Sequence, residues 1–183
     1  MIRLVGDLLD IADLDEGKFS ETPVKLDPIA VVKGVVESLH EQAVNKQVEV
    51  QIDFPQASAP FVLSTEKKLH KIFSNLLDNA IRYSSKQSEV QVRAEYKKRS
   101  VSISITDKGI GIPKQEQGRV FTKFFRASNA IRWDKEGSGL GLSMVKMLVE
   151  EAGGKIRFES KESEGSTFTI DLPADSSGEE SKD

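Results

Sequence analysis

Cysteine is absent from this chain of 183 residues, and histidine occurs only twice. The missing cysteines exclude disulfide frameworks, thiolate nucleophiles and cysteine-ligated zinc. His40 and His70 are far apart and cannot build a multi-histidine metal site without many carboxylates. We therefore expect both histidines to be ordinary surface residues, and the redox compartment stays unassigned.

A charge excess of one sign and long apolar runs are also lacking. The 26 Lys and Arg residues oppose 29 Asp and Glu residues, giving a net charge of −3, which argues against nucleic acid and acidic membranes as partners. No apolar run approaches the roughly 20 residues that a membrane span needs. The first residues carry acids too early for a secretory signal. We therefore expect a soluble chain with about one domain.

The hydrophobic pattern predicts a two-layer α/β sandwich, with helices on one face of a mixed, mainly antiparallel sheet. Asp27 before Pro28 predicts a helix N-cap and first turn. The predicted helices span residues 1–16, 28–45, 64–83 and 141–152, and the predicted strands lie near 48–52, 61–63, 90–96, 101–105, 155–160 and 166–172. The expected division is a helix end at 1–17, a linker at 18–27, one domain at 28–173 and a disordered acidic tail at 174–183.

A second, polar stripe accompanies the apolar one on the predicted helix at 64–83. Asn75, Asn79, Arg82 and Tyr83 stand at i, i+4, i+7 and i+8. Each mid-helix asparagine costs roughly half a kcal/mol relative to alanine. An amide oxygen on a hard metal ion, with a guanidinium nearby for phosphate, would explain them. A solvated helix face is the alternative interpretation.

Two glycine-rich turns could contact a nucleotide. Residues 107–113 follow a predicted strand directly, and the Asp107 carboxylate could accept a hydrogen bond from an amino group such as adenine N6. An ordinary β-turn is the alternative. Residues 137–142 open a helix whose N–H groups attract phosphate, unless they are only a flexible connection. The chain has neither a dinucleotide fingerprint nor the Gly-Lys-Ser/Thr of a P-loop.

The polar stretch at residues 126–136 is long for a connection and is typical of a lid or a disordered loop. Arg126 could reach a phosphate from this stretch. We expect Trp133, the only tryptophan, to pack on a neighbour rather than contact a ligand. We also expect core positions, rather than a nucleobase site, for Phe121, Phe124 and Phe125.

Together these segments resemble the ATP-binding catalytic domain of sensor histidine kinases, in the superfamily that includes gyrase and MutL-type ATPases. The resemblance covers about residues 24–173 and implies a Bergerat-type sandwich with an ATP lid. Five short motifs in the family's order carry it, namely the N box at 75–83, the first glycine box at 107–113, the F box at 120–126, the second glycine box at 137–142 and a last glycine box at 165–168.

The resemblance implies binding of ATP with Mg²⁺ and a role for each matching position. Asn79 would hold Mg²⁺ against the phosphates, and Asn75 would orient the attacking group. Asp107 would bind adenine N6, and Tyr83 would lie along the nucleotide. Arg126 and the lid would close over the γ-phosphate, so that Asn75 and Arg126 are the expected catalytic residues.

Further nucleotide contacts are implied by the same motifs. Arg82 stands where the family usually has lysine. The compact charge of an ammonium is thus replaced by a planar guanidinium with several N–H donors. The other implied positions are Gly109, Gly111, Ile112, Gly137, Gly139, Leu140, Gly141, Leu142 and Thr167.

The N-terminal residues 4–18 resemble the end of the second helix of the dimerisation and phosphoacceptor bundle. Neither His40 nor His70 lies in a phosphoacceptor motif, so the expected activity is histidine phosphorylation on a bundle outside these 183 residues. The implied partners are that bundle and a response regulator, in a homodimeric parent whose catalytic part is cytoplasmic. Two alternatives stay open, a non-catalytic nucleotide-binding module and an anti-sigma-type serine kinase or ATPase of the same superfamily.

Overall fold

The computed structural model describes residues 22–97 and 99–175 of the chain. Its strands are β1 (Val24–Leu26), β2 (Val48–Asp53), β3 (Val62–Ser64), β4 (Ser88–Lys97), β5 (Ser100–Asp107), β6 (Lys155–Lys161) and β7 (Gly165–Pro173). Its helices are α2 (Pro28–Ser38), α3 (His40–Lys46), α4 (Glu66–Tyr83), the 3₁₀ helix η1 (Lys114–Arg119), α5 (Ser128–Trp133) and α6 (Gly141–Glu151).

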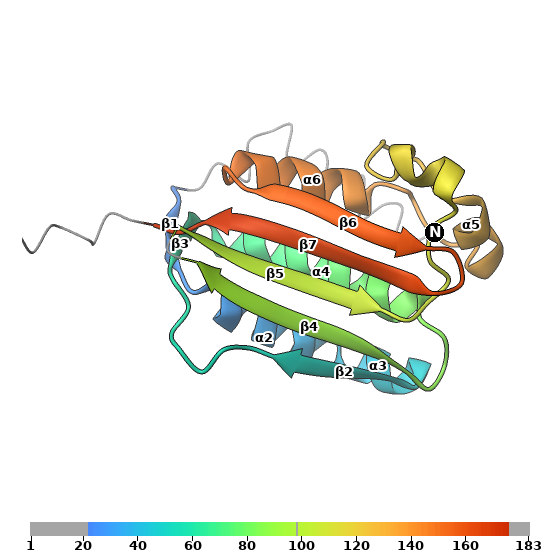
Figure 1. The fold of residues 1–183 in the computed structure, drawn as a ribbon, viewed down its shortest axis with the longest axis horizontal. Helices are drawn as coiled ribbons and strands as arrows, with labels where there is room; N and C mark the ends of the chain where they lie inside the picture. The colour runs from blue at the N-terminus through green and yellow to red at the C-terminus, as the bar shows by residue number, and fades with distance from the viewer. Residues whose placement is uncertain (1–21, 98, 176–183) are drawn as a thin grey trace, which may run out of the picture.

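The main sheet has the strand order β2-β4-β5-β7-β6. β2 pairs with β4 in parallel, and the other neighbours are antiparallel. Helices α2, α4 and α6 cover one face of this sheet (Figure 1). β1 and β3 form a separate two-stranded sheet. The predicted sandwich with a mixed, mainly antiparallel sheet is therefore confirmed.

Helix α4 is the central element of the helical layer. Thr65 caps its N-terminus, because its hydroxyl accepts a hydrogen bond from the Lys68 N–H at 3.2 Å. Burying each large side chain of its apolar stripe contributes roughly 1.5–3 kcal/mol. The stripe packs between the sheet and the neighbouring helices and consists of Leu69, Ile72, Phe73, Leu76, Leu77, Ala80 and Ile81. This packing fixes the adjacent, polar stripe of α4 in place.

The helix predicted at residues 28–45 is instead two helices, α2 and α3, which meet at Leu39. The Ser38 hydroxyl donates to the Val35 carbonyl at 2.8 Å, a local bond that competes with helix continuation. Leu39 then packs against the core and lines a cavity. The predicted N-cap is confirmed, since the Asp27 carboxylate accepts from the Ile29 N–H at 2.8 Å.

The described part of the predicted linker contains β1, which pairs with β3 in antiparallel register. Lys25 of β1 forms an ion pair with Asp175 at 2.7 Å, and the Asp175 N–H donates to the Phe61 carbonyl at 2.7 Å. The first and last described segments are thus joined to each other. The predicted helix end at residues 1–17 and most of the predicted tail lie outside the described residues.

The aromatic expectations are met only in part. Phe121 packs edge-on against Phe158, with 5.8 Å between ring centroids. Phe124 is 64% exposed, so its predicted core position is wrong. It has a positive φ of 63°, and the tight turn around it directs the ring to solvent. Phe125 is half-buried and lines the cavity described below.

The surface predictions are met more fully. His40 and His70 are exposed, as expected. Among the helices formed by residues 22–97 and 99–175, none combines the length and the apolar character required to cross a bilayer.

Candidate functional site

A cavity of about 360 Å³ lies between α4, the loop after β5, the lid at residues 126–136 and the start of α6. Most of the predicted site residues line it, although they come from segments far apart in the sequence. They are Asn75, Asn79, Arg82, Tyr83, Asp107, Gly111, Ile112, Arg126, Gly137, Gly139, Gly141 and Leu142. The fold therefore brings the predicted polar stripe and both glycine-rich turns to one place.

The loop after β5 is attached directly to the end of α4. The Ile110 N–H donates to the Tyr83 carbonyl at 3.1 Å, and Ser84 and Gly109 form an isolated antiparallel bridge. A Cβ atom on Gly109 would overlap the Tyr83 carbonyl. Only glycine permits this close approach, which joins the N box to the first glycine box.

Asp107 is the buried acid of the cavity, at 7% exposure. Burial raises the pKa of its carboxyl to about 6, although hydrogen bonds from the Gly109 and Ser166 backbones act in the opposite direction. The Gly109 N–H donates to the Asp107 carboxylate at 2.9 Å. At neutral pH the carboxylate is ionised and can accept a further hydrogen bond from a ligand amino group.

The β6–β7 turn supports the same loop from the other side. The Ser160 hydroxyl accepts from the Ile112 N–H at 2.9 Å and donates to the Gly165 carbonyl at 3.0 Å. The Gln117 amide donates to the Ile112 carbonyl at 3.0 Å. These bonds fix the backbone on which Gly111 and Ile112 face the cavity.

The two asparagines of α4 present carboxamides to the cavity. Asn75 donates its Nδ2 to the Lys71 carbonyl at 3.0 Å, and a Cβ on Gly141 would lie 3.0 Å from the Asn75 Oδ1. Asn79 lies about one turn further along α4 and lines the same cavity. Among the described residues, no group of three or more His, Cys, Asp or Glu is arranged so that it could hold a metal ion. This donor set fits a Mg²⁺ ion that arrives with phosphates and water, because Mg²⁺ commonly keeps both as ligands.

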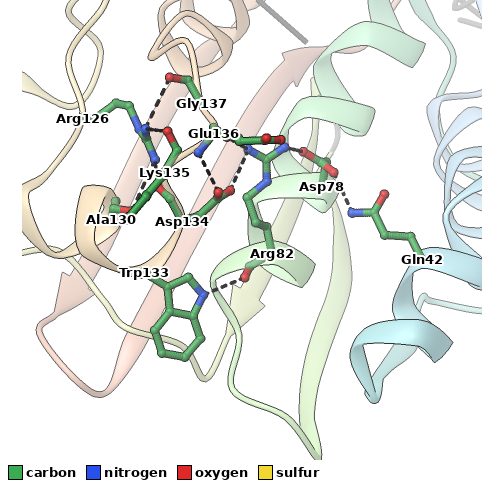
Figure 2. Close-up of polar contacts among 10 residues, drawn as sticks. All are labelled: Gln42, Asp78, Arg82, Arg126, Ala130, Trp133, Asp134, Lys135, Glu136 and Gly137. Carbon is green, nitrogen blue, oxygen red and sulfur yellow. Dashed lines mark hydrogen bonds and ion pairs between the residues drawn. The ribbon is translucent and has the colours of Figure 1, made fainter. Parts of the chain in front are cut away.

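Arg82 lines the cavity but is also bound to the lid. Its Nη2 contacts the Asp78 Oδ2 at 2.6 Å, and its Nη1 donates to the Glu136 carbonyl at 3.2 Å. The Asp134 Oδ2 lies 3.5 Å from the same Nη1. Figure 2 shows the Arg82 side chain reaching from α4 toward the lid.

Arg126 donates to three carbonyl groups of the lid and to the carbonyl of Gly137, directly after it (Figure 2). Those of Ala130, Lys135 and Gly137 lie at 3.3, 3.3 and 3.4 Å, and that of Asp134 is also contacted. The guanidinium thereby joins α5 (Ser128–Trp133) to the residues that follow it. In this arrangement Arg126 shapes the lid while lining the cavity.

Tyr83 and Trp133 are held by neighbours. Burial raises the pKa of the Tyr83 phenol, and the nearby Arg126 guanidinium opposes that shift. The Trp133 indole N–H donates to the Arg82 carbonyl at 3.0 Å, and the Lys46 ammonium lies 5.2 Å from the centre of its ring. Trp133 thus packs on neighbours, as predicted.

Three predicted positions do not line the cavity. Gly109 lies beneath the loop against Tyr83, as described above. Leu140 is fully buried in the protein at the start of α6. Thr167 faces away, with its hydroxyl 3.0 Å from that of Thr106, because neighbouring residues of a strand point to opposite sides.

Sequence reasoning did not identify several residues that line the cavity. Ser166 and Phe168 flank Thr167 on β7 and carry the period-two alternation that could have found them. Lys71, Ser74 and Asp78 continue the helical spacing of the N box, which is also a readable signal. Asn129 of the lid carries no such signal and donates to the Gly111 carbonyl at 2.9 Å. The lining residues not anticipated include Lys71, Ser74, Asp78, Asn129, Ser138, Ser166 and Phe168.

Comparison with known proteins identifies relatives of this chain. The family model described as "Histidine kinase-, DNA gyrase B-, and HSP90-like ATPase" matches residues 64–176. The circadian input-output histidine kinase CikA of Synechococcus elongatus is 33% identical over 176 residues, which are 94% of this chain and 23% of CikA. The sensor-like histidine kinase SenX3 of Mycobacterium tuberculosis is 35% identical over 171 residues, 93% of this chain and 41% of SenX3.

The fold also has solved counterparts. Full-length ShkA, whose crystal structure is in complex with AMPPNP, matches with a TM-score of 0.76 at 24% identity, over 94% of this chain and 35% of ShkA. The chain thus spans less than half the length of these relatives. All five motifs that carried the resemblance lie inside the region matched by the family model. The chain therefore belongs to the histidine kinase-, DNA gyrase B- and HSP90-like ATPase family and carries the catalytic ATPase domain of a sensor histidine kinase.

Proposed function

We propose that this domain binds Mg-ATP in the cavity and donates the γ-phosphoryl group to a histidine on a helical bundle outside these 183 residues. One observation carries the proposal. A single cavity is lined by a buried carboxylate, two guanidinium groups and the N-terminus of α6. A nucleotide matches these groups, because its base carries an amino group for the carboxylate and its phosphates carry negative charge for the guanidinium groups and the helix N-terminus. The AMPPNP bound to ShkA, an ATP analogue, supports the same assignment.

The adenine would lie against Asp107. Its N6 amino group would donate to the Asp107 carboxylate, which the Gly109 N–H leaves with further acceptor capacity. Ile110, Ile112 and Phe168 supply apolar walls of the cavity for the ring. Tyr83 would lie along the nucleotide.

The phosphates would lie toward the lid and α6. N–H groups at the start of α6 are available to an anion, and its helix dipole favours negative charge there. Arg82 and Arg126 line the same cavity, and their positively charged guanidinium groups suit phosphate. Asn79 would hold the Mg²⁺ that accompanies the nucleotide, and this ion would neutralise phosphate charge.

The chemistry asks mainly for positioning and charge neutralisation. In the transfer, an imidazole nitrogen of the acceptor histidine forms a bond to the γ-phosphorus, and the bond to the β,γ-bridging oxygen breaks to leave ADP. Asn75 would orient the attacking imidazole, and Arg126 would balance charge on the moving phosphoryl group. No residue of this chain needs to become a covalent intermediate.

The partners follow from this activity. The bundle would come from the parent chain or from its dimer partner, and a response regulator would receive the phosphoryl group from the bundle. We place the domain on the cytoplasmic side, where ATP is available.

Calorimetric titration with ATP and ADP, with and without Mg²⁺, tests the nucleotide site. We expect binding that responds to Mg²⁺ and is lost in Asp107→Asn, because the amide cannot supply the charged acceptor. Unchanged affinity in that variant would show that adenine does not bind at Asp107.

Transfer in trans to a bundle from the same parent tests the reaction. We expect radiolabel from γ-labelled ATP on the bundle histidine. Binding of ATP without transfer would instead support a non-catalytic module, and labelling of a serine on a partner would support a kinase of the anti-sigma type.

A further inference from the structure

Arg82 is the point at which α4 holds the lid. Its Nη1 donates to the Glu136 carbonyl at 3.2 Å and lies 3.5 Å from the Asp134 carboxylate. Its own carbonyl accepts from the Trp133 indole N–H at 3.0 Å. Three lid residues, at positions 133, 134 and 136, therefore contact one residue of the helix (Figure 2). We call these contacts the lid latch.

Neighbouring groups fix the positions of the two carboxylates that contact Arg82. The Asp134 Oδ1 accepts from the Glu136 N–H at 2.8 Å, which fixes that carboxylate within the lid. On the α4 side, Asp78 accepts from the Gln42 amide at 2.6 Å and pairs with Arg82 through its other oxygen. Because Gln42 belongs to α3, three separate elements meet at this guanidinium.

The guanidinium is thus already engaged by two carboxylates. The Arg82, Asp78 and Asp134 side chains are only 16%, 24% and 24% exposed, so water screens their attraction less than at an open surface. Arg82 nevertheless lines the nucleotide cavity. A phosphate that uses Arg82 must therefore compete with Asp134 for the same fork of N–H groups.

We propose that Asp134 is a positioning residue that holds Arg82 and the lid together without nucleotide, and that a polyphosphate displaces it. The phosphates then replace the Asp134 carboxylate as partners of the Arg82 guanidinium, and Trp133 loses its contact with α4. The nucleotide part of this inference rests on the proposed function. The latch itself does not, because it exists between residues of the protein alone.

Trp133 is a built-in reporter, since it is the only tryptophan of the chain. We propose acrylamide quenching of its fluorescence in the nucleotide-free protein, in Asp134→Asn and in Glu136→Gln. The second variant is the matched control, because it removes the same charge from the same lid while the latch uses only the Glu136 backbone. We expect acrylamide to quench Trp133 more strongly in Asp134→Asn than in wild type. Quenching in Glu136→Gln should equal that of wild type.

Nucleotide then tests the displacement. Adenosine carries the base without phosphates, so it should leave Trp133 quenching unchanged, whereas Mg-ATP should increase it. We also expect Asp134→Asn to bind Mg-ATP about two- to fivefold more tightly than Glu136→Gln, the size of one weak ion pair removed from competition. Arg82→Lys should show the loosened lid even without ligand, because an ammonium cannot reproduce the fork.

The two proposals fail in different ways. Equal quenching of wild type, Asp134→Asn and Arg82→Lys, with circular dichroism showing all three folded, would overturn the latch whatever the ligand. Calorimetric binding of Mg-ATP without a change at Trp133, or equal affinity of Asp134→Asn and Glu136→Gln, would overturn the displacement and leave the nucleotide site standing. Absence of any binding of adenosine and ATP would overturn the proposed function, and the nucleotide-free comparison would still decide the latch.

Discussion

At the scale of single residues, the Asp107 carboxylate combines burial with a role toward ligand. Burial raises its pKa to about 6, so it changes charge in a range where exposed aspartates stay ionised. Two consequences can be measured, one on binding and one on folding.

The binding prediction concerns pH. The free protein takes up a proton at Asp107 as pH falls through about 6, and the protonated carboxyl is a weaker acceptor for adenine N6. We expect constant adenosine affinity above about pH 7 and a progressive loss below about pH 6, measured by calorimetry. Adenosine avoids the titration of phosphate groups. A profile that is flat down to pH 5 would contradict the assigned contact.

The folding prediction is that the substitution that weakens nucleotide binding, Asp107→Asn, raises the stability of the domain. Because the folded-state pKa of Asp107, about 6, lies above the unfolded value of 3.8, this residue lowers stability progressively as pH rises from about 4 to about 6, and the full cost remains above pH 6. We expect Asp107→Asn to stabilise the nucleotide-free domain at pH 8 by up to about 3 kcal/mol, from a shift of about two pKa units. The gain should fall to a small fraction of that value near pH 4, where the folded-state carboxyl is protonated and an unfolded aspartate is only about half ionised. Denaturant unfolding at the two pH values measures it.

At the scale of elements, the contact between the end of α4 and the loop after β5 builds the site. The Gly109 position has no room for a Cβ atom because the Tyr83 carbonyl occupies it. We expect Gly109→Ala to destabilise the domain by about 1–3 kcal/mol, as overpacking does, and to weaken ATP binding. Gly118→Ala is the matched control, since nothing lies within 4 Å of its added methyl group. Thermal unfolding and calorimetry of both variants check this, and equal behaviour would contradict it.

The element scale also explains the main errors of prediction. Periodicity predicted one helix at residues 28–45, yet the helix is interrupted at Leu39, next to the local bond from the Ser38 hydroxyl to the Val35 carbonyl. The break creates α3, whose Gln42 and Lys46 contact α4 and the lid. Likewise, Phe124 was expected in the core because its apolar character was read without its positive φ.

At the scale of the whole molecule, both ends of the described chain meet at the small β1–β3 sheet. Asp175 is joined to Lys25 and to the Phe61 backbone, with only 5% of its side chain exposed. We expect Asp175→Asn to lower the free energy of unfolding by about 1 kcal/mol, because Lys25 is half-exposed and keeps most of its hydration. Chemical denaturation in low salt measures this. No loss of stability would show that the ion pair adds nothing to the backbone contacts.

The sequence by itself determined the layered fold, the ATPase family and the polar stripe of α4. Those properties follow from local chemistry, namely the period of apolar residues, N-caps such as Asp27, and the order of glycine-rich motifs. Only the tertiary structure decided which side chains face the cavity, that Asn129 and Ser166 belong there, and that Thr167 does not. It also decided that Arg82 is held by Asp78 and Asp134. Such pairings join residues more than 50 positions apart as well as neighbours on one helix, and no local pattern records a long-range contact, because packing of the whole domain sets its distance and direction.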